Sequence, residues 1–269
     1  MKKFQFLSGL LSVLFLLSVF QISCFAKTGN SFSWYCVHVK DHKRPVADAE
    51  LSFVQELDGF YLDPNVSETG EEKVIYLTFD AGYENGNVSK VLDVLKEENV
   101  SGSFFILEHL IQKNPELVKR MVAEGHLVAN HTARHKDMSK ADNSTLLKEL
   151  ETLEKQYYDL IGQEMPKFYR PPEGRFSRSN LECLKENGYK TIFWSFAYPD
   201  WDNQRQMPPE KAIKIILENL HNGEIMLLHP TSATNASILK DVIRELKSQG
   251  YRFAKVDELV YHDLQKGQE

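Results

Sequence analysis

The stretch VIYLTFDAGYENG, residues 74–86, decides the fold. Its first part, residues 74–79, is an almost unbroken apolar run, which is typical of a strand buried inside a parallel sheet. Asp80 follows at the carboxyl end of this run and leads into a glycine turn. Sites in α/β folds are built at that end of the strands. Taken alone, this stretch favours the simpler interpretation that Asp80 caps the turn, because aspartate favours such positions.

From Lys73 onward the chain alternates between strand-like and helix-like segments. The expected strands are residues 74–79, 102–107, 126–130, 167–170, 189–196, 224–228 and 251–256. The expected helices are residues 88–98, 115–124, 144–161, 179–187, 209–221 and 237–249. This alternation indicates βαβ units with parallel pairing. It predicts an α/β fold, a distorted or incomplete (β/α) barrel of about seven parallel strands, with a doubly wound open sheet as the alternative.

The start of the chain has the pattern of an export signal. Lys2 and Lys3 precede an apolar stretch, and Cys24-Phe25-Ala26 follows it, so we expect cleavage after Ala26. The apolar stretch approaches membrane-spanning length, so attachment to a membrane through residues 4–23 stays open. Lipidation of Cys24 is the third interpretation, although Gln21 fits that signal poorly.

These signals divide the chain into four parts. They are a signal peptide or membrane anchor, residues 1–26; an N-terminal extension, residues 27–69; a main domain, residues 70–262; and a C-terminal tail, residues 263–269. The expected extension has apolar residues at roughly helical spacing between residues 46 and 57 and then turn signals.

Composition excludes some functions. With 42% hydrophobic and 26% charged residues the chain can build a sizeable core. Its net charge of −6 is not that of a typical nucleic-acid-binding protein. An anionic polymer would therefore have to be held by local contacts. Cys36 and Cys183 remain beyond the leader, and two such distant cysteines do not form a disulfide framework, so we expect unpaired thiols.

Polar residues follow five of the expected strands. They are Asp80, His131 and His135 in NHTARH, Arg170 in YRPPEGR, Asp200 beside Trp201 in AYPDW, and His229 in MLLHP. Because the carboxyl ends of parallel strands meet at one mouth of a barrel, we expect these side chains to converge. This is the placement of catalytic residues in such a fold. The simpler alternatives are a surface ion pair for the arginine and a core position for the tryptophan.

His131 and His135 are four residues apart. A helical face or a turn can bring two such rings to one metal ion. A hydrogen-bonded histidine pair is the alternative. The metal site is favoured because Asp80 and His229 are expected at the same mouth of the barrel.

The order TFD, H[ST]xxH, RPPxG, DW and LLH resembles the polysaccharide deacetylases, carbohydrate esterase family 4, over roughly residues 70–262. The YENG continuation and the preceding DGFYLD are most similar to the delta-lactam-biosynthetic de-N-acetylases of spore-forming bacteria. The resemblance implies an exported hydrolase that removes the acetyl group of N-acetylmuramic acid in peptidoglycan glycan strands. The product would lead to muramic δ-lactam in the spore cortex.

The resemblance implies roles for the residues of the first three motifs. Asp80 would be the general base, and Arg170 would pair with it and keep it ionised. His131 and His135 would bind a divalent metal, usually zinc. Most of the family has a metal-binding aspartate where this chain has Ala81, so we expect the metal to be held weakly.

The remaining roles concern the leaving group and the substrate. Asp200 would orient His229 and favour its protonated form, and His229 would be the general acid. The backbone amide near Glu173 would help to hold the oxyanion. Trp201 and Leu228 would form walls of the pocket for the acetyl methyl group.

Four questions stay open. The substrate could instead be N-acetylglucosamine of peptidoglycan or chitin. The protein could be a glycan-binding pseudoenzyme without metal, although Asp80 and His229 are not needed for binding alone. Arg175 or Arg178 could meet the lactyl carboxylate as a bidentate donor, or be a solvated surface arginine. Glu84 and Asn85 are near Ala81, but the sequence does not say where they point.

Overall fold

The computed structural model describes residues 30–259. The leader expected at residues 1–26 and the tail expected at residues 263–269 lie outside the described residues. Between residues 30 and 259, every helix is too short or too polar to cross a bilayer.

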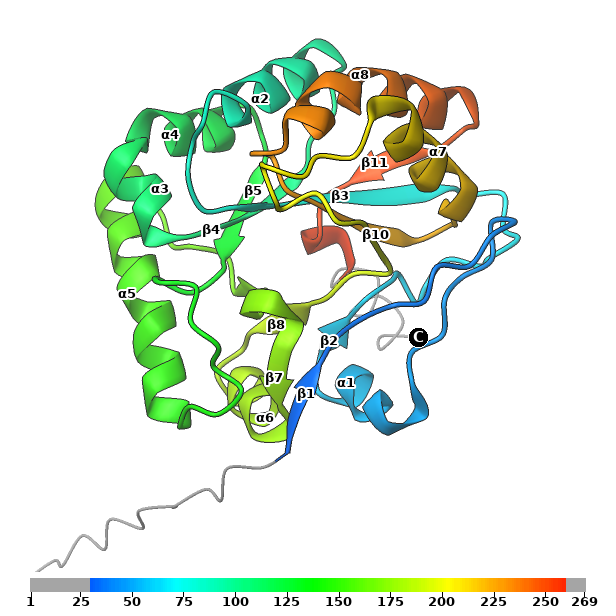
Figure 1. Cartoon of the computed structure of the whole chain (residues 1–269). Helices are drawn as coiled ribbons and strands as arrows, with labels where there is room; N and C mark the ends of the chain where they lie inside the picture. Colours follow the sequence, from blue (N-terminus) through cyan, green and yellow to red (C-terminus); the bar gives the residue numbers. More distant parts are fainter. Residues whose placement is uncertain (1–29, 260–269) are drawn as a thin grey trace, which may run out of the picture.

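One parallel sheet forms the centre of the fold (Figure 1). Its strands are β2 (Gly59–Phe60), β3 (Val74–Ala81), β4 (Ser103–Ile106), β5 (Leu127–Asn130), β6 (Phe168–Tyr169), β8 (Lys190–Ile192), β9 (Phe196–Ala197), β10 (Glu224–Leu228) and β11 (Arg252–Ala254). They pair in the order β2-β8-β6-β5-β4-β3-β10-β9, and β11 also pairs with β3. Each of these pairings is parallel.

Residues 189–196 connect the two sides of the curved sheet. Residues 189–196, expected as one strand, are interrupted at residues 193–195. The first part, β8, pairs with β6, and the second part, β9, pairs with β10. The bend therefore joins the two sides of the sheet. The predicted distorted barrel is confirmed, and the open doubly wound sheet is not what the chain forms.

The helices lie outside the strands as a second layer (Figure 1). They are α2 (Val88–Glu97), α3 (Glu108–Lys113), α4 (Pro115–Ala123), α5 (Asn143–Ile161), α6 (Arg178–Glu186), α7 (Pro209–Asn219) and α8 (Ala233–Ser248). In α2 the buried residues Val88, Val91, Leu92 and Leu95 follow the helical period, which is why this segment packs on the sheet. Helix α8 begins four residues before its expected start because the Ser232 side chain caps it.

The N-terminal extension departs most from expectation. The short elements η1 (Ala49–Leu51) and α1 (Phe53–Glu56) replace a continuous helix. Strand β1 (Ser31–Ser33) pairs antiparallel with β7 (Arg175–Ser177), which follows the short turn η2 (Pro172–Gly174). Phe32 packs against the rings of Phe53 and Phe176, at centroid distances of 5.3 and 5.6 Å. These are long-range contacts, so no local pattern predicts them.

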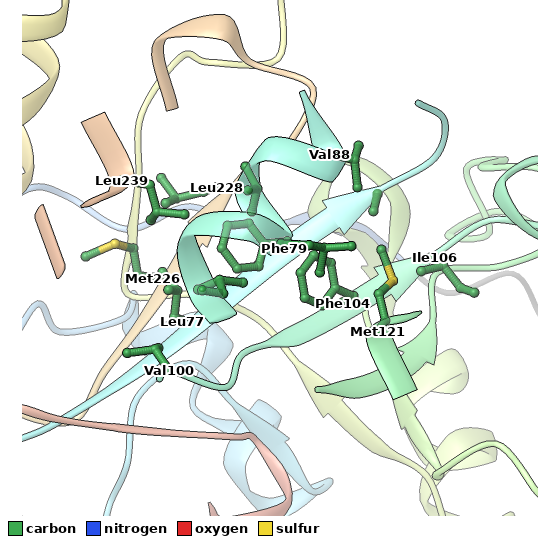
Figure 2. Close-up of a cluster of buried hydrophobic side chains, with 14 of the residues drawn as sticks. Leu77, Phe79, Val88, Val100, Phe104, Ile106, Met121, Met226, Leu228 and Leu239 are labelled. Atoms are coloured by element: carbon green, nitrogen blue, oxygen red, sulfur yellow. The ribbon is translucent and has the colours of Figure 1, made fainter. Parts of the chain in front are cut away.

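The main core fills the space between the sheet and α2, α4 and α8. Figure 2 shows Phe79, Phe104, Met226 and Leu228 in this cluster, all with 2% exposure or less. The core fixes β3, β4 and β10 side by side. The carboxyl ends of these strands therefore have fixed positions relative to one another.

Candidate active site

Asp80, at the carboxyl end of β3, is held by a buried arginine. Arg170 Nη1 donates to Asp80 Oδ1 at 2.8 Å. The guanidinium is completely buried and also donates to the carbonyl of Ile192 at 3.0 Å and to Thr78 Oγ1 at 2.9 Å. Arg170 is therefore not a surface ion pair. Its other hydrogen bonds fix the direction from which it meets the carboxylate.

The surroundings of Asp80 keep it ionised. Burial acts to raise the pKa of Asp80, because a buried carboxylate loses its hydration. The charges of His131, Arg170 and His229 outweigh burial and hold this pKa below its ordinary value. Burial lowers the pKa of His131 to about 4, so the positive neighbours of Asp80 that remain are Arg170 and the protonated form of His229. Asp80 is thus a carboxylate that can accept a proton.

The loop after β5 brings the two predicted histidines together. Thr132 and His135 have left-handed φ angles of 70° and 55°, and His135 N–H donates to Thr132 Oγ1 at 2.9 Å. This tight turn places the rings of His131 and His135 4.8 Å apart between centroids. The sequence placed these rings on a helical face or a turn, and the structure has the turn.

His131 presents a lone pair to the site. Its Nδ1 lies 2.8 Å from the carbonyl oxygen of Arg170. A carbonyl oxygen only accepts, so Nδ1 carries the proton and Nε2 of the neutral ring is free to bind a metal. Nε2 lies 3.5 Å from Asp80 Oδ2. This donor set fits two positions of a divalent cation.

A third protein ligand is not grouped with these rings. Within residues 30–259, no three His, Cys, Asp or Glu side chains form a cluster that could hold a metal ion. Ala81 is buried in the main core. Glu84 accepts from the backbone N–H of Gly86 and from that of Ser89 in the first turn of α2, and Asn85 donates to the carbonyl of Thr231 at 2.8 Å. In the described residues, neither side chain therefore completes a metal-binding cluster with the two histidines.

His229 and Asp200 form the second pair. His229 Nδ1 lies 2.7 Å from Asp200 Oδ1, and His229 N–H donates to Asp200 Oδ2 at 2.8 Å. Burial acts to lower the pKa of His229, but the hydrogen bond and charge of Asp200 outweigh it and raise this pKa. The pair therefore favours a protonated ring whose Nε2 is available as a proton donor.

Sequence reasoning missed the residues that hold Asp200 in place. Asn235 Nδ2 donates to Asp200 Oδ2 at 2.5 Å and to the carbonyl of His229 at 3.1 Å. Tyr198 in turn donates to Asn235 Oδ1. Asn235 lies in the first turn of α8, where an asparagine is ordinary, so its sequence position carried no signal.

One cavity of about 780 Å³ brings the predicted groups together. Its lining includes Asp80, His131, His135, Glu173, Trp201 and His229. Arg170 and Asp200 are fully buried partners of two of these residues. The convergence expected from the strand ends is present in the structure.

One predicted wall residue is corrected. Leu228 is packed in the main core, near Phe79 and Leu239, and does not line the cavity (Figure 2). Leu227 lines it instead. Successive side chains of a strand point to opposite faces, so only one of these two leucines can face the site.

The arginines after η2 have different surroundings. Arg175 Nε lies 3.2 Å from Glu173 Oε2, and its Nη1 donates to Asp137 at 3.1 Å. Arg178 lies over the ring of Phe53 at 4.3 Å. Arg175 is therefore next to a cavity-lining residue, whereas Arg178 packs on the N-terminal extension.

The N-terminal extension supports three cavity-lining residues. Trp34 N–H donates to the carbonyl of Gly174, and its Nε1 donates to the carbonyl of Trp194, both at 2.8 Å. His38 Nε2 donates to the carbonyl of Ala197 at 2.7 Å. A Cβ at Gly174, whose φ is +66°, would lie 2.8 Å from the Trp194 ring, so this close packing requires glycine.

An ionised carboxylate, a histidine whose protonated form is favoured and two imidazoles that could hold a metal surround one cavity of a parallel barrel, and this set of groups is that of a hydrolase site. A model of polysaccharide deacetylases matches residues 67–192. The chain is 39% identical over 230 residues to the peptidoglycan-N-acetylmuramic acid deacetylase PdaA of Bacillus subtilis, covering 85% of this chain and 86% of that protein. The chain belongs to the polysaccharide deacetylase family.

Two further similarities agree with this assignment. The solved structure of Bacillus subtilis PdaA, described as a family 4 carbohydrate esterase, superposes with a TM-score of 0.81 at 38% identity, over 87% of this chain and 98% of that chain. A peptidoglycan-N-acetylglucosamine deacetylase of Bacillus cereus is 35% identical over 196 residues, covering 70% of this chain and 89% of that protein.

Proposed function

We propose that this protein hydrolyses the acetamido group of N-acetylmuramic acid in peptidoglycan. The observation that carries the chemistry is the placement of Asp80 and His229 on one cavity, each with a buried charged partner. The similarity to PdaA over most of both chains supports the choice of substrate. The expected export signal agrees with a substrate outside the cytoplasm.

Amide hydrolysis needs two proton transfers. An amide carbonyl is weakly electrophilic and its nitrogen is a poor leaving group. Asp80, kept ionised by Arg170, takes the proton of the attacking water. His229, kept protonated by Asp200, gives a proton to the departing nitrogen. The products are acetate and a free amine on the sugar.

His131 and His135 would hold a divalent metal, in our proposal zinc. When bound, the metal supplies Lewis acidity at the amide carbonyl. The missing aspartate at Ala81 makes weak binding the expected outcome. We assign the backbone near Glu173 to the developing oxyanion, and Trp201 with Leu227 to the acetyl methyl group.

The freed amine and the lactyl carboxylate belong to the same muramic acid residue. Condensation of these two groups, with loss of water, gives a δ-lactam. We therefore assign the protein to formation of muramic lactam in the spore cortex. The lactyl carboxylate has to be free for this step, so a reaction that cleaves the stem peptide from it must come first.

A second candidate substrate is N-acetylglucosamine of the glycan strand. Glu173 places a carboxylate on the cavity, and an anionic side chain is a poor neighbour for a lactyl carboxylate. Arg175 offsets this charge only in part, because it also pairs with Asp137. The relative from Bacillus cereus agrees with this alternative.

The deciding experiment uses residues 27–269 with peptidoglycan, the same glycan without its peptides, and chitin oligomers. Each is incubated with zinc and with chelator, and mass spectrometry identifies the sugar that loses acetyl. We expect loss from muramic acid in the peptide-free glycan, and less of it with chelator. Loss from glucosamine alone would establish the second substrate. Sugar binding without acetate release at any metal concentration would identify a glycan-binding pseudoenzyme.

The pH dependence of turnover tests the His229–Asp200 pair. The raised pKa of His229 extends its protonated form to higher pH, and activity should fall as the pH rises through that pKa. Asp200→Asn removes the charge that raises it, so the alkaline limb of the kcat profile should move to lower pH. If kcat falls at every pH and the alkaline limb keeps its position, Asp200 only supports the fold.

A substitution at Trp34 tests whether the N-terminal extension supports the cavity wall. Trp34→Phe keeps an aromatic ring but removes the donor to the Trp194 carbonyl, so we expect kcat to fall by up to about 10²-fold through misplacement of the cavity wall. The exposed neighbour Tyr35 provides the control, as Tyr35→Phe loses only a surface hydrogen bond to Asp48. Unchanged kinetics with a lowered Tm for Trp34→Phe would assign Trp34 to stability alone.

A further inference from the structure

Two aromatic side chains line the cavity while remaining open to solvent. Trp201 is 61% exposed and Tyr83 is 43% exposed. Large apolar side chains in the described part of the chain are otherwise mostly buried in its cores. Exposed aromatic rings gathered at a cavity mark a binding surface rather than a core.

Tyr83 is held in a fixed position. Its hydroxyl accepts from Asn203 Nδ2 at 2.6 Å, and Asn203 comes two residues after Trp201. The loop that carries Tyr83 is tied down in turn, because Asn85 and Asn87 both donate to the carbonyl of Thr231, at 2.8 and 3.0 Å. The rings of Tyr83 and Trp201 therefore lie on two loops that are joined to each other.

This arrangement is outside the proton-transfer machinery. The Tyr83 hydroxyl is bonded to Asn203, and the ring of Trp201 lies edge-on to His229 with 6.3 Å between centroids. A cavity of about 780 Å³ also exceeds what an acetamido group fills. The remaining space and its aromatic rim can receive more of the substrate than the reacting group.

We propose that Tyr83, oriented by Asn203, forms beside Trp201 an aromatic subsite for a sugar ring adjacent to the one that is deacetylated. The axial C–H groups of a pyranose form an apolar face that packs on an aromatic ring, while the hydroxyl groups stay in water. The ligand is an uncharged hexopyranose of a glycan strand. This inference rests on the proposed function, and it means that the protein binds glycan strands in preference to single sugars.

The test measures equilibrium binding of two fragments by calorimetry, N-acetylmuramic acid alone and a peptide-free peptidoglycan hexasaccharide. The wild-type protein should bind the hexasaccharide more tightly than the single sugar. Tyr83→Ala should reduce that preference about 3- to 10-fold, the worth of one aromatic contact. Tyr83→Phe keeps the ring face and should retain most of it. Tyr158→Ala removes a comparably exposed tyrosine on α5, away from the cavity, and should match the wild type.

Equal weakening of both fragments by Tyr83→Ala, or no weakening, would overturn the subsite. A Tm measurement for each variant separates lost contacts from lost folding. Acetate release from the same fragments separates the two proposals. Preference for length without acetate release would keep the subsite and remove the hydrolytic function. Acetate release without preference for length would remove the subsite alone.

Discussion

Asp80→Asn should lower kcat on peptide-free peptidoglycan by about 10²–10⁴-fold. Asparagine has nearly the same shape but cannot take a proton from water. Acetate release under saturating substrate measures the effect. KM should change less than kcat, because the lost interaction belongs to the transition state.

Asp80→Asn also leaves the buried guanidinium of Arg170 without its anion. Breaking a buried ion pair by removing one partner costs roughly 3–5 kcal/mol of stability. The free energy of unfolding therefore has to be measured beside kcat, and the assay run where the variant is folded. Asp159→Asn removes an exposed carboxylate that pairs only with Lys155 on α5, so it should change neither quantity. Normal turnover by folded Asp80→Asn would refute the base assignment.

His229→Gln should lower kcat by a similar factor, about 10²–10⁴-fold, because glutamine cannot protonate the departing nitrogen. The variant should also lose the alkaline limb that the raised pKa of His229 produces. The pH–rate profile of the variant is the measurement. His109→Gln changes an exposed histidine in α3 and serves as the control. A variant that keeps the wild-type alkaline limb would assign that limb to another group.

The sequence predicted the barrel because its signals are local and repeated. Six of the seven expected strands are followed by an expected helix, and Gly125, Gly162 and Gly188 mark helix ends at positive φ. The break within residues 189–196 was not predictable in this way. It depends on the pairing of β8 and β9 with strands distant in sequence, and the run YKTIFWSF contains no glycine or proline that would indicate a bend.

The same distinction between local signals and long-range contacts applies to the candidate site. Residues directly after strands, such as Asp80 and His229, could be placed because a strand end fixes where a side chain emerges. Leu228 was misassigned because the strand pattern did not reveal which of two adjacent leucines faces the site. Asn235 and Trp34 act through hydrogen bonds that span the fold, and neither lies in a motif.

The most direct measurement is multiple-turnover acetate release from peptide-free peptidoglycan, with free amines on muramic acid counted by mass spectrometry. We predict one new amine for each acetate released, at a rate that Asp80→Asn and His229→Gln each reduce by at least about 10²-fold. Acetate release that survives both substitutions together in folded protein would contradict it, as would a wild-type protein that leaves every acetamido group intact.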